Sequence, residues 1–334
     1  MNYIGSKYKL LPFLSETIEA VVGADMSDMV FCDIFAGTGI VGRHFKTRVG
    51  KVVANDWEYY GYVLNRNYIG NIRDIGNAAA YIDELNSLSP VADGFIYRNY
   101  CAGSGSGRQY FYDRNGMKID AVRRRIEQWR TEGTVDDDTY FFLLCSLLES
   151  ADKYANTASV YGAFLKQLKK TAQRDMTVEP ANFETCSNAH EVHCADANEL
   201  IRRTSGDILY LDPPYNARQF GANYHMLNTI AEYKPFVPQG KTGLRDYLRS
   251  SYCSARSVAA AFEEIIEAAQ FRYVFLSYNN EGLMSPDDIR RIMSKYGRYD
   301  LAHKDYQRFK ADKTDSRNHK AASTTEYLHI LEKF

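Results

Sequence analysis

The hydrophobic pattern of the chain alternates between short apolar runs and longer segments with helical spacing. Residues 29–34, 51–54 and 208–211 are short, apolar and rich in β-branched side chains, as expected of buried strands. Residues 7–22 and 40–47 carry apolar side chains three or four positions apart, which predicts amphipathic helices. Strands that alternate with helices predict an α/β fold with a Rossmann-like sheet. Further strands are expected at residues 191–194, 272–277, 298–305 and 325–331, the last two as an antiparallel pair.

The pattern changes between residues 101 and 185. This region has few strand signals and contains three stretches with helical spacing, at residues 119–130, 140–154 and 161–171. The strand pattern resumes at residue 191. An insertion within one sheet domain explains this order better than two consecutive domains. We therefore expect a sheet domain formed by residues 1–100 and 186–334, with residues 101–185 as an inserted helical region.

The composition is that of a soluble globular protein. Of the 334 residues, 45% are hydrophobic and 25% are charged. No uncharged apolar run approaches the ~18 residues that a membrane helix needs. The N-terminus also lacks the apolar core of a signal peptide. A cytoplasmic protein with no membrane partner is therefore expected.

The cysteines indicate neither disulfide bonds nor a metal site. The six cysteines lie mostly far apart, which favours reduced thiols in a chain of this size. Cys186, His190, His193 and Cys194 do cluster, but no CxxC pair accompanies them and the adjacent His193 and Cys194 do not fit the usual zinc spacing. We predict no metal.

The formal net charge of −1 neither indicates nor excludes a nucleic-acid partner, because the relevant charges are local. Residues 118–130 hold five basic and two acidic side chains, and residues 298–320 hold seven Lys or Arg against four Asp. For a single basic helix, a solvated surface is the commoner explanation.

A glycine-rich turn follows the first predicted strand of the sheet. Asp33 lies at the end of this strand, the turn contains Gly37 and Gly39, and Gly42 completes a GxGxxG spacing. Glycine lets the backbone approach a ligand closely and adopt positive φ. Asp56 ends the next strand, where a carboxylate can accept hydrogen bonds from both ribose hydroxyls. These residues predict an adenosine-bearing ligand, which could be a nicotinamide, a flavin or another cofactor.

A second site is predicted at Asp212-Pro213-Pro214-Tyr215, directly after the strand at residues 208–211. Proline has no N–H for a strand ladder, so the strand stops at the edge where ligands bind in open α/β sheets. The Asp212 carboxylate and the stiff Pro213 carbonyl can accept hydrogen bonds from an amino group, while the Tyr215 ring stacks on the planar system that carries it. An adenosine cofactor beside a receptor for a planar amine suggests methyl transfer from S-adenosylmethionine.

With these residues the chain resembles the Dam-like N6-adenine DNA methyltransferases, especially those that accompany restriction endonucleases. The resemblance covers most of the chain and follows the family's order of elements, which is more specific than any one motif. Its segments are residues 3–7, 33–39, 56, 155–166, 212–220 and 223–225. The resemblance implies a catalytic methyltransferase domain at residues 1–100 and 186–334, with an inserted helical recognition region at residues 101–185. We expect this insert and the basic segment at residues 298–320 to recognise the DNA, since phosphate contacts fix the register and base edges specify the sequence.

The resemblance also implies which residues bind the cofactor. Lys7 matches a position that contacts the methionine carboxylate, Asp56 matches the ribose-binding acid, and Asp196 resembles an acid near the cofactor's adenine. The full set of implied cofactor residues is Tyr3, Lys7, Asp33, Phe35, Gly37, Gly39, Asp56, Asp196 and Asp212.

The same resemblance implies the catalytic residues Asp212, Pro213 and Tyr215. The reaction would be site-specific methylation of adenine N6 in duplex DNA within a restriction-modification system, which suggests a cognate endonuclease as a partner. Hydrogen bonds from N6 to Asp212 and Pro213 would draw the nitrogen towards tetrahedral geometry and stabilise its developing positive charge. Because a paired adenine cannot reach such a pocket, the base must flip out of the duplex and stack on Tyr215.

Three alternatives remain open. The acceptor could be adenine in RNA or a protein glutamine, although enzymes of the latter kind usually have Asn in place of Asp212. The chain could also be a non-catalytic DNA-binding subunit with a methyltransferase fold. The intact glycine loop, Asp56 and residues 212–215 argue against that last alternative.

Overall fold

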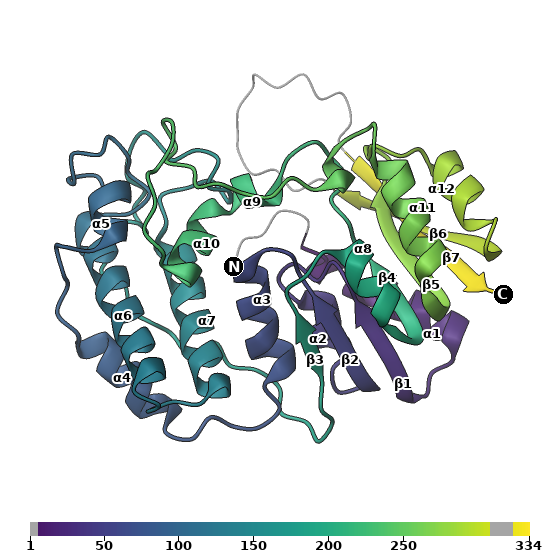
Figure 1. Cartoon of the computed structure of the whole chain (residues 1–334), viewed down its shortest axis with the longest axis horizontal. Coiled ribbons are helices and arrows are strands. Elements are labelled where there is room, and N and C mark those ends of the chain that lie inside the picture. Colours follow the sequence, from purple (N-terminus) through teal and green to yellow (C-terminus); the bar gives the residue numbers. More distant parts are fainter. Residues whose placement is uncertain (1–5, 308–322) are drawn as a thin grey trace. The chain divides into compact units, whose positions relative to one another are not determined.

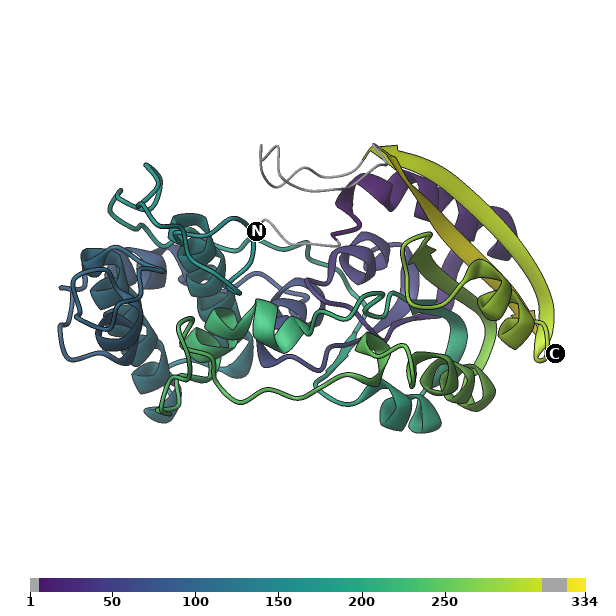
Figure 2. The ribbon, with the colours of Figure 1, turned by 90° about the horizontal axis from the view of Figure 1, so that it is seen from above.

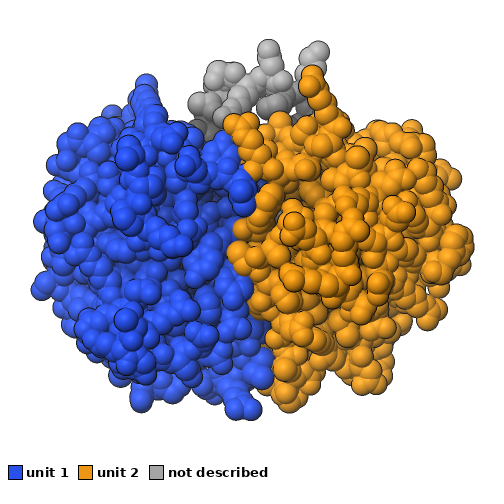
Figure 3. Space-filling view, viewed as in Figure 1, with its two compact units in different colours: residues 1–5, 58–185, 220–248 blue, residues 6–57, 186–219, 249–334 orange. Residues whose placement is uncertain are grey.

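The computed structural model describes residues 6–307 and 323–334. The described residues fall into two compact units (Figure 3). The helical unit contains residues 58–185 and 220–248, and the sheet unit contains the described part of residues 6–57, 186–219 and 249–334. Each unit is therefore assembled from segments that lie far apart in the sequence.

The sheet unit is built on a mixed seven-stranded sheet with the order β3-β2-β1-β4-β5-β7-β6 (Figure 1). Strands β1 to β5 pair in parallel, whereas β7 runs antiparallel to both β5 and β6. The predicted α/β fold is confirmed, and so is the antiparallel pairing of the last two strands. The strands are β1 (Met26–Asp33), β2 (Val49–Asn55), β3 (Glu191–His193), β4 (Ser205–Leu211), β5 (Gln270–Asn279), β6 (Gly297–Gln307) and β7 (Ser323–Lys333).

Helices cover both faces of this sheet, and Figure 2 shows α1 and α11 on opposite sides of the strands. On one face Cys32, Leu209 and Val274 pack with Leu200 of α8 and Phe262 of α11 in a buried apolar cluster. On the other face the Phe31 ring stacks on Phe45 at the end of α2, with centroids 4.4 Å apart. Burial on both faces accounts for the continuous apolar runs of the central strands.

The described helices of the sheet unit come before its first strand or between its strands in chain order. They are η1 (Tyr8–Leu10), α1 (Leu11–Val22), α2 (Ile40–Phe45), α8 (Ala197–Leu200), η3 (Ile201–Arg203), η4 (Ser251–Cys253), α11 (Val258–Ala268) and α12 (Pro286–Met293).

The helical unit surrounds a core rich in tyrosine and phenylalanine. Tyr60, Tyr100, Tyr110, Tyr161 and Tyr224 belong to this core and are each 0% exposed. The unit comprises α3 (Tyr59–Asn65), the π-helical turn η2 (Arg66–Gly70), α4 (Ala78–Ser87), α5 (Phe95–Tyr100), α6 (Asp113–Thr131), α7 (Asp137–Tyr154), α9 (Phe220–Asn223) and α10 (His225–Glu232).

The basic residues of α6 have partners inside the helical unit. Arg123 is buried and donates to the carbonyls of Ile230 and Ala231, at distances of 3.1 and 3.0 Å. These carbonyls lie in the last turn of α10, where a helix has no intrahelical donors to offer. Lys118 is also buried and donates to two carbonyls at the end of α4. The segment at residues 118–130 is thus largely a structural element of this unit and not a solvated basic face.

The remaining arginines of this segment form ion pairs within the same unit. Their partners are Asp93 for Arg124, Glu84 for Arg125 and Asp137 for Arg130.

One predicted helix is absent. Residues 161–171 form turns and irregular backbone, and no helix or strand occurs between residues 155 and 190. The buried Asn156 side chain donates to the carbonyls of Gln109 and Leu165 and accepts from the Lys169 N–H at 2.9 Å. Side-chain bonds of this kind compete with helical backbone bonds. The apolar residues of the segment therefore face the core from a loop.

The two compact units do not coincide with the segments expected from the sequence. The helical unit starts at residue 58 and includes residues 220–248, so it extends beyond the predicted insert at residues 101–185. The difference arises because α3, α4 and α10 contribute to the same buried core as α6 and α7. The assignment of DNA recognition to the insert and to residues 298–320 remains a prediction, and residues 308–320 of the second segment lie outside the described residues.

Candidate active site

Four acidic residues follow consecutive strands at one edge of the sheet. Asp33 ends β1, while Asp56, Asp196 and Asp212 come just after β2, β3 and β4. Asp33 is level with Ala54 of β2 and Tyr210 of β4 in the strand register, and these parallel strands all end at the same edge. The structure therefore brings together acids that the sequence spreads over most of the chain, at the edge where open α/β sheets bind ligands.

The glycine turn lies between β1 and α2 and is held by these acids. Gly37 and Gly39 have φ angles of 54° and 76°, a region that favours glycine. The Gly37 N–H donates to an Asp56 carboxylate oxygen at 2.7 Å, and the Gly42 N–H donates to Asp33 Oδ2 at 3.2 Å. The loop that is predicted to hold the cofactor is thus fixed by the two acids beside it.

Asp33 is a buried acid with incomplete hydrogen bonding. Its side chain is 1% exposed, and Oδ1 has no hydrogen-bond partner among the described residues. The pKa of Asp33 is raised to about 8, mainly by burial and then by the charges of Asp212 and Asp56, whereas the Gly42 hydrogen bond and the charge of Lys7 lower it. A buried carboxylate oxygen without a donor has a strong requirement for a polar or cationic partner.

Asp212 forms a cluster of three charged residues with Lys7 and Glu326. Lys7 Nζ is 2.9 Å from Asp212 Oδ1 and 3.2 Å from Glu326 Oε1, and the Ser277 hydroxyl donates to Glu326 at 2.8 Å. Burial raises the pKa of Asp212 to about 6, although Lys7 opposes this shift. Burial opposes the charged form of Lys7, but Asp212 and Glu326 outweigh it and raise the pKa of Lys7 well above its ordinary value.

Tyr215 completes the group around Asp212. Its ring centroid lies 5.8 Å from Lys7 Nζ, and the ring meets Tyr278 edge-on with centroids 6.2 Å apart. The Tyr215 carbonyl accepts a hydrogen bond from the Leu283 N–H at 3.0 Å, which fixes the backbone after the two prolines. Pro213 is buried, whereas Asp212 and Tyr215 keep part of their surface exposed. An aromatic face and a carboxylate are thus presented side by side.

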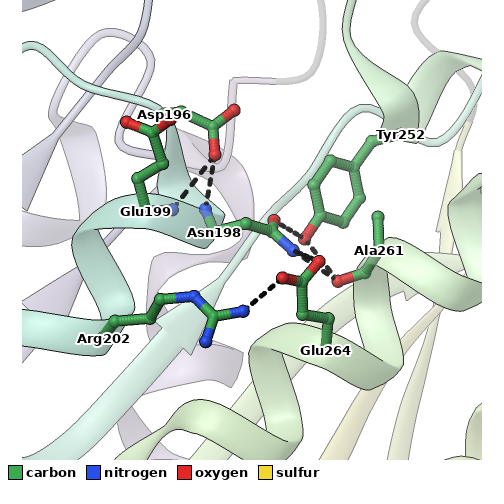
Figure 4. Close-up of polar contacts among 7 residues, drawn as sticks. All are labelled: Asp196, Asn198, Glu199, Arg202, Tyr252, Ala261 and Glu264. Atoms are coloured by element: carbon green, nitrogen blue, oxygen red, sulfur yellow. Dashed lines mark hydrogen bonds and ion pairs between the residues drawn. The ribbon is translucent and has the colours of Figure 1, made fainter.

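Asp196 caps the helix that follows β3 (Figure 4). Its Oδ1 accepts from the N–H groups of Asn198 and Glu199 at 2.8 and 3.2 Å, a standard N-cap arrangement. The hydroxyl of Tyr252 donates to Asn198 Oδ1 at 2.7 Å, and its ring packs edge-on against Phe35 of the glycine loop, with centroids 4.9 Å apart. Tyr252 therefore links the Asp196 helix to that loop.

Sequence reasoning missed three residues of this site. Two of them, Ser277 in β5 and Glu326 in β7, lie in strands that were predicted only from their apolar residues. The third, Tyr252, lies in the short helix η4, which no sequence pattern predicted. The one local signal at Glu326 is an acid on the same face of β7 as the buried Leu328 and Ile330, and it does not identify Lys7 as the partner. Tyr3, another predicted cofactor residue, lies outside the described residues.

The cysteine and histidine cluster forms polar pairs. Cys186 Sγ lies 3.3 Å from His190 Nε2, and His190 Nδ1 accepts from the Val52 N–H at 3.0 Å. Within residues 6–307 and 323–334, no three His, Cys, Asp or Glu side chains are arranged as metal ligands. No helix of the described residues is long and apolar enough to cross a membrane.

Comparison with known proteins agrees with the geometry. The sequence profile of the D12 class N6 adenine-specific DNA methyltransferases matches residues 3–292. The type II methyltransferase M.NlaIII of Neisseria lactamica is 62% identical over 333 residues, which cover 100% of this chain and 99% of that protein. M.CviAII of Paramecium bursaria Chlorella virus 1 is 37% identical and 93% of each chain is covered. M.FokI of Planomicrobium okeanokoites is 34% identical, with the match covering 53% of its length. The chain therefore belongs to the D12 class of N6 adenine-specific DNA methyltransferases.

Proposed function

We propose that the chain transfers the methyl group of S-adenosylmethionine to N6 of a flipped-out adenine in duplex DNA, with Asp212, Pro213 and Tyr215 holding the base. The observation that carries this proposal is the position of Asp212. It follows β4 at the edge of the sheet that also carries Asp33, Asp56 and Asp196, and it lies next to the Lys7 ammonium, which is close to the Tyr215 ring. The names of the relatives, which are type II methyltransferases, support a role in restriction-modification with a cognate endonuclease.

The residues at the sheet edge suit S-adenosylmethionine, which supplies an activated methyl group when bound. The positive-φ turn at Gly37 and Gly39 allows close approach of a ligand to the backbone. Asp56 would accept hydrogen bonds from the ribose hydroxyls. Asp33 Oδ1, which has no partner in the described part of the chain, would accept from the amino group of the methionine moiety.

Other residues would bind the remaining parts of the cofactor. Phe35, whose ring packs against Tyr252, and Asp196 would border its adenine. Lys7 carries three N–H donors, and the two carboxylates account for two of them. The third would bind the methionine carboxylate. Tyr3 stays a predicted contact.

The target base would be held by three groups of one tetrapeptide. Asp212 and the Pro213 carbonyl would accept hydrogen bonds from the two N–H groups of N6, which would orient the nitrogen lone pair towards the methyl group and stabilise the charge that develops on the nitrogen. Tyr215 would stack on the base. Direct displacement then depends on alignment of the reacting atoms more than on a strong base. Asp212 need not be the final proton acceptor.

Substitution of Asp212 tests this proposal. Asp212→Ala should lower methyl transfer to duplex DNA by at least ~10³-fold, because the acceptor for N6–H is lost, while the protein stays folded. The measurement is transfer of labelled methyl groups from S-adenosylmethionine, with the product analysed as N6-methyladenine. Asp25→Ala is a matched control, since Asp25 is exposed and precedes β1 at the opposite edge of the sheet.

Two outcomes would contradict the proposal. Full activity of Asp212→Ala would show that this carboxylate does not hold the base. Stronger methyl acceptance by single-stranded RNA or by protein than by duplex DNA would assign a different substrate to the same site.

A further inference from the structure

Glu326 brings a second carboxylate into the Asp212 site. It lies in β7, opposite Asn279 of β5, and its side chain is largely buried. One ammonium, that of Lys7, is shared between Asp212 at 2.9 Å and Glu326 at 3.2 Å. The three groups together therefore carry one net negative charge, whereas Asp212 and Lys7 alone would be neutral.

This net charge bears on the reaction assigned to the site, and the inference rests on that proposed function. Methyl transfer places a positive charge on N6 of adenine, next to the carboxylate that accepts its hydrogen bond. Lys7 Nζ lies 5.8 Å from the centre of the Tyr215 ring, so its charge is close to the place where the base would stack. An ammonium at this distance repels the developing charge unless another group offsets it.

We propose that Glu326 is a positioning residue for methyl transfer, which holds the Lys7 ammonium so that the Asp212 carboxylate can accept a hydrogen bond from the target amino group and not from Lys7. As the N6–H group approaches, the hydrogen bond between Lys7 and Asp212 is exchanged for one from the base, and Glu326 continues to hold Lys7. Lys7 can then serve the cofactor without neutralising the carboxylate that faces the adenine.

The surroundings of Glu326 support this role. The Ser277 hydroxyl donates to Glu326 Oε1 at 2.8 Å, so the carboxylate is oriented by β5 as well as by Lys7. Removing two charges from water and pairing them contributes little net stability. The arrangement is therefore better explained by its effect on Asp212 than by a gain in folding free energy.

The role of Glu326 has a signature in the pH dependence of the reaction. The titratable groups that act on Asp212 and its neighbours come from several elements, namely Lys7, Asp33, Tyr210, Tyr215 and Glu326. Burial is the main cause of the raised pKa of Asp212, and the negative charge of Glu326 raises it further. Removal of that charge should lower the pKa of Asp212, and the acid limb of kcat/KM should move to lower pH.

The experiment compares Glu326→Gln with Glu332→Gln. Glu332 lies on the same strand and pairs with Arg272 and Arg298 at the surface, so it is a matched control. For Glu326→Gln we expect a single-turnover methylation rate at least ~10-fold below that of the wild type. The acid limb should move to lower pH, while Tm and the Kd for S-adenosylmethionine stay near the wild-type values. A rate within twofold of the wild type, or an unmoved acid limb, would overturn the proposal.

A double variant tests whether Glu326 acts through Lys7. If Glu326 offsets the charge of Lys7, then Lys7→Met/Glu326→Gln should be no more than about twofold slower than Lys7→Met alone at saturating cofactor. Rate losses that multiply would overturn the proposal. This comparison also decides the matter if Glu326→Gln does not fold, and failure of the double variant to fold would assign Glu326 a structural role instead.

Asp212→Ala, measured in parallel, separates this inference from the proposed function. If Asp212→Ala is inactive and Glu326→Gln behaves as the wild type, only the role of Glu326 is wrong. If Asp212→Ala is active, the proposed function itself fails.

Discussion

The buried carboxyl group of Asp33 lowers the stability of the folded protein when it ionises, although its proposed role is to bind the cofactor. It is 1% exposed, and burial raises its pKa from 3.8 to about 8. The folded protein thus favours the protonated form of Asp33. The contribution of this protonated form to the free energy of unfolding is fully present below about pH 4 and is lost as the pH rises through about 8. Each pH unit between these values destabilises the wild type by at most about 1.4 kcal/mol relative to a residue that cannot ionise. Asp33→Asn should therefore gain stability relative to the wild type from pH 5.5 to 8, measured by urea unfolding without cofactor.

Asp25→Asn is the matched control for this pH series. Asp25 is exposed and its pKa is lowered by hydrogen bonds from Ser27, so it is already ionised above pH 5. Its stability difference from the wild type should stay constant between pH 5.5 and 8. Parallel curves for Asp33→Asn and the wild type would mean that the Asp33 carboxyl ionises normally in the folded protein.

Residues of the site differ in how well the sequence predicts them. Asp33, Asp56 and Asp212 each come directly after an apolar run, so a local pattern places them at a strand end. Glu326 lies within a strand and meets Lys7 only because β7 inserts between β5 and β6. No local pattern encodes that strand order, and the partner of Lys7 could be found only in the folded structure.

At the scale of elements, the Asp196 side chain at the N-terminus of α8 has two roles. Asp196 caps the helix, and it is also a predicted cofactor residue. Asp196→Ala should destabilise the protein by about 1 kcal/mol, whereas Asp196→Ser keeps a capping oxygen and should stay near wild-type stability. Both should weaken binding of S-adenosylmethionine roughly tenfold or more if the carboxylate contacts the cofactor. Urea unfolding and titration calorimetry measure the two effects separately.

Asp136 provides the control for this pair of substitutions. It caps α7 in the helical unit by accepting from the Thr139 N–H at 2.8 Å. Asp136→Ala should lose a similar amount of stability without any change in cofactor affinity. Wild-type affinity of Asp196→Ser would leave Asp196 as a helix cap alone.

The strands were easier to predict than the loops. Every predicted strand overlaps an observed one, and burial on both faces gives the central strands apolar runs that are visible in the sequence. The helix predicted at residues 161–171 is wrong, since its apolar residues pack on the core of the helical unit from an irregular loop fixed by Asn156. Helical spacing records which residues are buried, and a loop held by side-chain bonds can bury the same residues.

At the scale of the whole molecule, the helical unit is larger than the insert that the sequence suggested. Contacts inside this unit join residues 101–185 to residues 220–248. Arg123 donates to the carbonyls of Ile230 and Ala231, and the Tyr161 N–H donates to the Asn223 carbonyl at 2.7 Å. The hydrophobic pattern reports each helix separately, but it does not report which helices share a core. In a chimera with a related protein, residues 58–185 and 220–248 therefore have to be exchanged together.

This organisation predicts the behaviour of chimeras with a relative that has a different target sequence. Exchange of residues 58–185 together with 220–248 keeps the helical core and these contacts intact, so this chimera should unfold cooperatively and remain active. Exchange of residues 101–185 alone, from a donor without an arginine at position 123, leaves the Ile230 and Ala231 carbonyls without their donor and should lower the free energy of unfolding by several kcal/mol. If the helical unit reads the DNA, as proposed for its insert, the first chimera should methylate the donor's sequence. Sequencing of methylated plasmid DNA measures this outcome. A stable, active chimera that retains the original target sequence would place recognition in the sheet unit, because the chimera keeps that unit unchanged.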